Sequence, residues 1–131
     1  LAGVRLGFVI AAPAIIQRFR ELLGDWPVSA DAISAGLAAY TDTTWPDTTR
    51  ERLKVTAQQL DELLIQSGLE IAGGTSLFRL PRCNSAETRF TRLLQAGILV
   101  RPFDHDDTLL RFGLPHGEAA WRRLAAALRL P

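Results

Sequence analysis

Apolar positions change their spacing several times along the first part of the chain, and each change marks an expected element. Residues 4–11 alternate between apolar and other side chains, which predicts a strand. Pro13 then occupies a favoured first helical position, and apolar residues at helical spacing continue to Leu23. Gly24 ends this helix, and Ser29 caps a second helix of small residues. The sequence therefore begins with a strand followed by two helices.

The middle of the chain predicts a long helix, a strand and a shorter helix. Leucines recur at helical spacing over residues 44–68, between otherwise polar positions, so one face of this helix is expected to be solvated. Residues 75–82 (TSLFRLPR) read as a strand. The tetrapeptide NSAE at 84–87 is a capping box, with Asn84 as the cap, and opens a helix that Gly97 stops.

The C-terminal part predicts a hairpin and a last helix. Residues 98–103 and 109–114 are expected strands, and DHDD at 104–107 is the turn between them. The final helix starts near Pro115. The expected order is β-α-α-α-β-α-β-β-α, an α/β chain with an α+β unit at its C-terminal end. We expect a boundary near residue 45, with 1–45 as a piece of one domain and 46–131 as a second, small domain.

Composition narrows the class of protein. The 131 residues are 47% hydrophobic and 22% charged, with a net charge of +1, so no broad field favours nucleic acid or an anionic membrane as partner. The apolar runs are too short to span a bilayer. One cysteine, Cys83, fits a reducing, cytoplasmic location. The chain has no methionine and opens on LAGVRLG, so we expect a piece of a longer protein.

Each expected strand carries one arginine inside its apolar pattern: Arg5, Arg79, Arg101 and Arg111. One interpretation is that arginine covers a solvated strand face. The other is that arginines from neighbouring strands converge on a small dianion, because the guanidinium binds carboxylate and phosphate through two parallel bonds. Asp and His at 104–107 match no strong metal-binding pattern, so no metal site is expected.

Three stretches resemble a known family. LAGVRLG at 1–7 is similar to the segment that follows the Schiff-base lysine in pyridoxal-phosphate enzymes of the aspartate aminotransferase superfamily. GILVRPFD and LLRFGLPHGEAAWRRLAAAL, within 97–128, resemble its C-terminal domain. The nearest branch is that of histidinol-phosphate aminotransferases and L-threonine-O-3-phosphate decarboxylases, and RFGLP with the following E-x-x-W-x-R-L, together with GGTSLFRL, looks most like the decarboxylases. The resemblance implies the C-terminal small domain of the fold, preceded by the last strand and helices of the large domain.

The resemblance also implies roles for residues. It makes Arg5 the ligand of the cofactor phosphate and Arg111 the ligand of the substrate α-carboxylate. It places Arg101 and Ser76 near the substrate, although the family has asparagine close to the position of Ser76. The catalytic lysine would lie upstream of Leu1, so no catalytic residue is assigned within the chain. Its one lysine, Lys54, is expected to be a solvated group on the long helix.

The implied function is that of a pyridoxal-phosphate-dependent lyase. The parent would decarboxylate L-threonine O-3-phosphate to (R)-1-aminopropan-2-yl phosphate for cobalamin biosynthesis, as a homodimer that binds a small phosphorylated amino acid. An aminotransferase of the histidinol-phosphate type is the second hypothesis. The third is a non-catalytic anion-binding or interaction domain, since the lysine is absent from this chain.

Overall fold

The computed structural model describes residues 2–129, and these form two compact units divided between Pro46 and Asp47. Leu1, the first residue of the LAGVRLG motif, lies outside the described residues. The elements of the first unit, up to the start of the long helix, are η1 (Ala2–Val4), α1 (Pro13–Leu23) and α2 (Ala30–Thr41). The long helix α3 (Thr44–Gln66) begins at the division and belongs mostly to the second unit.

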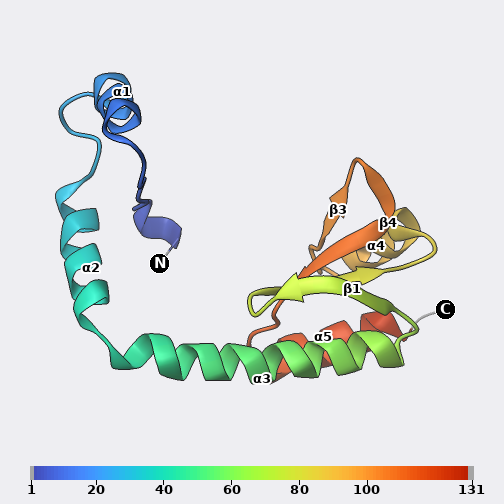
Figure 1. Ribbon diagram of the computed structural model, residues 1–131. Coiled ribbons are helices and arrows are strands. Elements are labelled where there is room, and N and C mark those ends of the chain that lie inside the picture. Colours follow the sequence, from blue (N-terminus) through green and yellow to red (C-terminus); the bar gives the residue numbers. More distant parts are fainter. Residues whose placement is uncertain (1, 130–131) are drawn as a thin grey trace. The chain divides into compact units, whose positions relative to one another are not determined.

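The second unit is a four-stranded antiparallel sheet with helices. Its further elements are β1 (Glu70–Thr75), β2 (Phe78–Arg82), α4 (Ala86–Gln95), β3 (Arg101–Phe103), β4 (Asp106–Gly113) and α5 (Gly117–Leu128). The strand order is β1-β2-β4-β3, so the long strand β4 lies inside the sheet, between β2 and β3 (Figure 1). The hairpin expected around residues 104–107 is present, and β3 and β4 pair antiparallel.

All three helices of this unit contribute to one hydrophobic core. Leu60 of α3, Leu93 of α4 and Leu124 of α5 are buried in the same cluster as Leu110 and Phe112 of β4. Residues 110 and 112 point to the same face of the strand, because side chains alternate. The helices therefore cover that face, and α3 and α5 run below the sheet in Figure 1. The other face of the sheet carries Arg111 and is not covered by the helices that form the core cluster.

The strand expected at residues 4–11 is absent, which corrects the sequence prediction. Val4 belongs to a 3-10 turn, and residues 5–12 have no regular structure. A strand is held by hydrogen bonds to a neighbouring strand, and all strands described within residues 2–129 belong to the sheet of the second unit. The segment instead packs along α2. Phe8 and Tyr40 form an edge-to-face pair with centroids 5.4 Å apart, and a Cβ at Gly36 would lie 2.6 Å from Leu6 Cδ2.

The helices of the first unit form where expected but bury little. Gly24 ends α1 with φ +73°, and the Ser29 hydroxyl accepts a hydrogen bond from the Ala32 amide at 3.2 Å. The apolar stripe of α1, however, has no buried residue, and Leu22 is 75% exposed. Large apolar side chains are exposed throughout this unit, from Phe8 to Trp45. Helical periodicity thus predicted the helices correctly, but the apolar stripe of α1 is not buried among the described residues.

Two further expectations need correction. The strand β1 was not expected, because Gly73 and Gly74 weaken strand propensity. It forms as the partner of β2, with a register shift between Ile71 and Gly73 that accommodates the glycines. The capping box was also wrong, since α4 has Ser85 and not Asn84 at its N-cap position, and the Ser85 hydroxyl donates to Thr88 Oγ1 at 2.9 Å.

Candidate functional site

Two of the expected ligands lie directly opposite each other on the sheet. Arg111 of β4 pairs in register with Arg101 of β3. Residues opposite each other on antiparallel strands point to the same face, so both guanidinium groups belong to the face without the core helices. Arg111 is half-buried and Arg101 is exposed. Two like charges at such a position repel, and an anion lying between them relieves that repulsion.

The ring of Phe78 supports the Arg111 guanidinium. Arg111 Cζ lies over this ring, 5.3 Å from its centroid, at the distance of a cation–π contact. Phe78 pairs in register with Gly113, two residues beyond Arg111 on the same face. Because Gly113 has no side chain, the space beside Arg111 is open to the ring. Sequence reasoning missed Phe78, although its alternation with Leu80 in the strand was a signal that it shares one face of the sheet.

Arg79 does not join this pair, although it is the next residue along β2. It pairs with Phe112, which places it on the helix-covered face. There its Nε donates to Asp61 Oδ1 of α3 at 2.6 Å, with the two side chains 18% and 24% exposed. Arg79 is therefore a structural link between β2 and α3. Arg101 and Arg111 share a face of the sheet, as the hypothesis of converging strand arginines requires, whereas Arg79 lies on the other face.

Ser76 lies in the two-residue turn between β1 and β2, next to Leu77, and is exposed. The Leu77 amide donates to Thr75 Oγ1 at 3.1 Å, which stabilises the turn. The turn immediately precedes Phe78, the residue whose ring contacts Arg111. Because Phe78 pairs with Gly113, the turn that contains Ser76 lies at the end of the sheet where β4 ends.

Arg5 belongs to the first unit and adopts an unusual backbone conformation. Its φ is +58°, the left-handed region that costs energy for a residue with a side chain, and among the described residues it alone has a positive φ without being glycine. It is exposed, and it follows the 3-10 turn where the sequence predicted a strand. Strained backbone is frequent at ligand-binding positions, so this conformation makes Arg5 a candidate ligand-binding residue.

A hydrogen-bonded network links the end of β2 to the start of β4, at the opposite end of these strands from the Phe78–Gly113 pair. Arg82 donates to Thr108 Oγ1 and lies 3.7 Å from Asp106 Oδ2. The Thr108 hydroxyl and amide both donate to Asp106 Oδ1, the amide at 2.9 Å. These hydrogen bonds stabilise the carboxylate and lower the pKa of Asp106 below its ordinary value. The expected DHDD turn is therefore shorter, with Asp106 and Asp107 inside β4.

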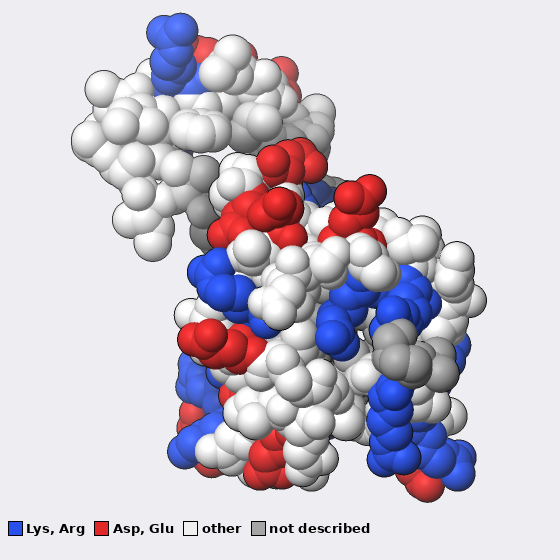
Figure 2. All heavy atoms as spheres, turned by 90° about the vertical axis from the view of Figure 1, so that its right-hand side faces the viewer, with Lys and Arg blue, Asp and Glu red and all other residues white. Residues whose placement is uncertain are grey.

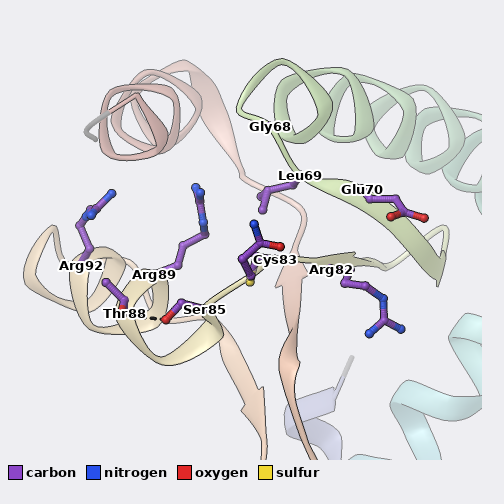
Figure 3. A pocket seen from close by; sticks show the side chains of 10 residues that line it. Gly68, Leu69, Glu70, Arg82, Cys83, Ser85, Thr88, Arg89 and Arg92 are labelled. Atoms are coloured by element: carbon purple, nitrogen blue, oxygen red, sulfur yellow. Dashed lines mark hydrogen bonds between the residues drawn. The ribbon is translucent and has the colours of Figure 1, made fainter.

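A pocket of about 400 Å³ lies at the start of α4, away from the arginine pair of β3 and β4. Figure 3 shows Arg89 and Arg92 projecting from α4 toward the same side, with Cys83 and Leu69 between these arginines and Glu70 of β1. Burial raises the pKa of the Cys83 thiol, and the charge of Arg89 opposes this effect. A thiol with a raised pKa is a poor nucleophile at neutral pH, so the pocket offers no evident chemistry.

Several features of the described surface limit other interpretations. Figure 2 shows acidic and basic side chains intermixed on the side that it draws, in keeping with the net charge of +1. Within residues 2–129, no group of three or more His, Cys, Asp or Glu side chains is placed to hold a metal ion. No helix in that range combines the length and apolar character needed to cross a membrane. Lys54 is exposed on α3, as expected.

Comparisons with known proteins give a consistent result. The family model for aminotransferase class I and II matches residues 1–128. The chain is 40% identical over 131 residues to a threonine-phosphate decarboxylase of Pseudomonas aeruginosa, covering 98% of this chain and 38% of that protein. A threonine-phosphate decarboxylase of a Sinorhizobium species is 39% identical over 130 residues, again with 98% and 38% covered. A histidinol-phosphate aminotransferase of Chromohalobacter salexigens is 33% identical over 111 residues, covering 81% and 32%.

A solved structure shares the fold. The crystal structure of a provisionally named histidinol-phosphate aminotransferase from Erwinia carotovora atroseptica superposes with a TM-score of 0.85 at 21% identity, over 98% of this chain and 38% of that one. The expected fold class, a mixed chain whose small antiparallel sheet belongs to an aminotransferase fold, is therefore confirmed. The chain spans less than two fifths of the length of these relatives.

Proposed function

The chain belongs to the aminotransferase class I and II family, as its motifs predict, and from this premise we propose that it is the C-terminal part of a pyridoxal-phosphate-dependent L-threonine-O-3-phosphate decarboxylase. Two relatives with that name, at 40% and 39% identity over almost the whole chain, support this branch. The observation that carries the proposal is the pair Arg101 and Arg111 on the face of the sheet opposite the core helices, called the open face below. Two adjacent guanidinium groups suit a substrate with two anionic groups.

In this proposal the residues of the sheet bind and orient the substrate. Arg111, held over Phe78, binds the α-carboxylate through two parallel hydrogen bonds. Arg101 lies opposite and interacts with the same substrate, and Ser76 supplies a hydroxyl from the turn. The bond that breaks at Cα is the one held perpendicular to the cofactor ring, so the placement of the carboxylate decides between loss of carbon dioxide and loss of a proton.

The cofactor would be held mainly by residues outside this chain. Pyridoxal phosphate, when bound, supplies the electron sink that bond cleavage at Cα requires. We assign the cofactor phosphate to Arg5, an exposed arginine in the LAGVRLG motif. Lys54 does not suit the aldehyde end, since it lies on the solvated face of α3. The lysine that holds the cofactor would precede Leu1.

The division into units supports the proposed domains. We assign the first unit to the end of the large cofactor-binding domain and the second to the small domain. The exposed apolar side chains of the first unit, such as Leu22 and Trp26, support packing against the remainder of the protein and against a second subunit of a homodimer. The single cysteine supports a reducing, cytoplasmic location.

An aminotransferase is the second candidate. The fold match to the Erwinia protein and the sequence match to the Chromohalobacter protein favour it, because both carry the name histidinol-phosphate aminotransferase. An aminotransferase also binds carboxylates, those of its keto-acid substrate, so the arginine pair supports substrate binding in both candidates, and the matches at 40% and 39% identity favour the decarboxylase. The third candidate, a non-catalytic anion-binding domain, is favoured only by the lack of a suitable lysine in this chain.

Product analysis separates the three candidates. The complete polypeptide that carries this sequence is loaded with pyridoxal phosphate and given O-phospho-L-threonine or, separately, histidinol phosphate, each with and without 2-oxoglutarate. We expect carbon dioxide and 1-aminopropan-2-yl phosphate in equal amounts, and no glutamate. Glutamate without carbon dioxide, from this substrate or histidinol phosphate, would establish an aminotransferase, and no turnover of either would favour the non-catalytic candidate.

Two matched tests accompany this assay. Arg111→Gln is expected to lose at least about 100-fold in kcat/KM, because a charge-assisted bidentate contact is lost, whereas Arg122→Gln on the exposed surface of α5 should leave kcat/KM unchanged. In the 131-residue chain alone, borohydride reduction with the cofactor should leave Lys54 without a stoichiometric adduct. A single adduct there would contradict the assignment of the lysine to an upstream segment.

A further inference from the structure

Phe78 is an aromatic residue that the hydrophobic core does not use. It is half-buried, and it belongs neither to the buried cluster nor to the partly buried side chains packed against that cluster. Its neighbours Arg79 and Pro81 point to the helix-covered face, where Pro81 is fully buried. A phenylalanine on the open face of a sheet exposes apolar area, so a role other than packing is expected for it.

The Phe78 ring lies against the Arg111 guanidinium, the group that binds the substrate carboxylate in the proposed function. Arg111 Cζ lies over the ring of Phe78 at 5.3 Å from the centroid. A cation–π contact engages the flat face of the guanidinium, while the N–H groups that bind a carboxylate lie in its plane. The same arginine can therefore be held by the ring and bind a carboxylate at the same time.

The neighbouring charge makes such support necessary. Arg101 stands directly across from Arg111 on the same face, and repulsion between the two guanidinium groups favours their turning away from each other. Without a fixed support, Arg111 has many rotamers to lose when a ligand binds. The ring, anchored by the pairing of Phe78 with Gly113, restricts these rotamers before the ligand arrives.

We propose that Phe78 is a positioning residue for carboxylate recognition, which holds the Arg111 guanidinium in the orientation that a bidentate carboxylate contact requires. This inference rests on the proposed function of the open face as the substrate site. It assigns selectivity for a substrate carboxylate, as opposed to a phosphate alone, to a residue that itself forms no polar contact. Phe78 is consequently expected to affect binding of the amino acid phosphate and not of the decarboxylated amine phosphate.

The test measures binding directly, so it does not depend on turnover. The complete polypeptide, labelled with ¹⁵N-arginine, is titrated with O-phospho-L-threonine and separately with 1-aminopropan-2-yl phosphate, while the Arg111 Nε–H signal is followed. Phe78→Leu is expected to weaken binding of phosphothreonine by about three- to tenfold. Affinity for the amine phosphate should change by less than about twofold, because it lacks the carboxylate.

Two other variants make the result specific. Phe78→Tyr keeps the aromatic face and should retain both the affinity and the ring-current shift of the Arg111 signal. Phe103→Leu removes another half-buried aromatic of the same sheet, one whose ring contacts His105, and should change neither. A thermal unfolding curve of each variant checks that the fold is retained.

Two results would overturn the inference. One is wild-type affinity for phosphothreonine in Phe78→Leu, with the ring-current shift lost. The other is an equal loss of affinity for both ligands, which indicates general damage. If the wild-type signal of Arg111 does not respond to phosphothreonine at all, the inference and the assignment of Arg111 both fail. Absence of carbon dioxide release with intact, Phe78-dependent binding contradicts the proposed function alone.

Discussion

The ion pair between Asp61 and Arg79 is predicted to stabilise the second unit far more than a comparable pair elsewhere on the same helix. Arg79 Nε lies 2.6 Å from Asp61 Oδ1, and the side chains are only 18% and 24% exposed. Arg50 and Asp47, near the start of α3, lie at a similar 2.7 Å but are 73% and 79% exposed. The two pairs therefore have similar N–O distances but differ in burial, and only the Asp61–Arg79 pair links a helix to a strand.

The contribution of each ion pair to the free energy of unfolding depends on how far the pair is shielded from water. A charge-assisted hydrogen bond with limited solvent access contributes about 1.5–3 kcal/mol, and removing one partner leaves the other partly desolvated. Partial exposure reduces this figure, so Asp61→Asn is expected to lower the free energy of unfolding by about 1–2.5 kcal/mol. An exposed pair contributes a few tenths of a kcal/mol, and Arg50→Gln should cost less than about 0.5 kcal/mol.

Urea unfolding of the 131-residue chain, followed by circular dichroism, measures these differences. Glu62→Gln, one residue along α3 and exposed, controls for removing a negative charge from the same part of the helix. A double-mutant cycle with Asp61→Asn and Arg79→Gln isolates the coupling between the two side chains. Equal costs for Asp61→Asn and Glu62→Gln, or a coupling near zero, would refute the reasoning from burial.

Three further predictions concern packing and titration. Leu60→Ala, at a fully buried position, should cost about 2–5 kcal/mol in unfolding free energy, whereas Leu22→Ala, on the exposed stripe of α1, should cost less than about 0.5 kcal/mol in the 131-residue chain; both are read from urea midpoints. Because burial raises the pKa of Cys83, iodoacetamide should alkylate this thiol more slowly in the folded chain than in the urea-unfolded chain at pH 8, and equal rates would contradict this. The contribution of the neutral thiol to stability is full below about pH 8.5 and should fall as the pH rises through the raised pKa. Because Thr108 lowers the pKa of Asp106, the stabilisation from this carboxylate is present above the aspartate pKa of the unfolded chain and is lost as the pH falls through the lowered pKa of the folded chain. The NMR shift of the Thr108 amide should therefore titrate below the ordinary aspartate range. A midpoint at or above that range would contradict the hydrogen bonds.

Local signals in the sequence were reliable where the structure depends on neighbours along the chain. Gly24 and Ser29 were read as helix boundaries, and both act as such. Likewise, Gly68 follows α3 with φ +78°, the left-handed conformation that glycine adopts at a helix end. These features involve a few consecutive residues, so a single sequence contains the information that determines them.

Predictions that depend on distant partners were less reliable. Residues 4–11 have the alternation of a strand, but the described residues offer them no strand to pair with. Strand β1 contains Gly73 and Gly74 and was missed, because its stability comes from pairing with β2. Sheet order and register also decide which face a residue occupies, and for that reason the sequence did not distinguish Arg79 from Arg111.

The candidate site was predictable in part. The motif around Arg111 indicated its importance, and the register then placed Arg101 opposite it. The contribution of Phe78 depends on a diagonal contact across β2 and β4 that no sequence motif expresses. The binding roles of Arg5, Ser76, Arg101 and Arg111 all stay predictions.

The central claim is that the substrate binds on the face of the sheet opposite the core helices. The most direct measurement is a ¹⁵N-arginine titration of the complete polypeptide with O-phospho-L-threonine, without pyridoxal phosphate so that the ligand is not consumed, and with side-chain signals assigned by single substitutions. The account predicts saturable shifts of the Arg111 and Arg101 Nε–H signals and no shift of Arg79, which lies on the other face and binds Asp61. Shifts of Arg79 without shifts of Arg111 would contradict it.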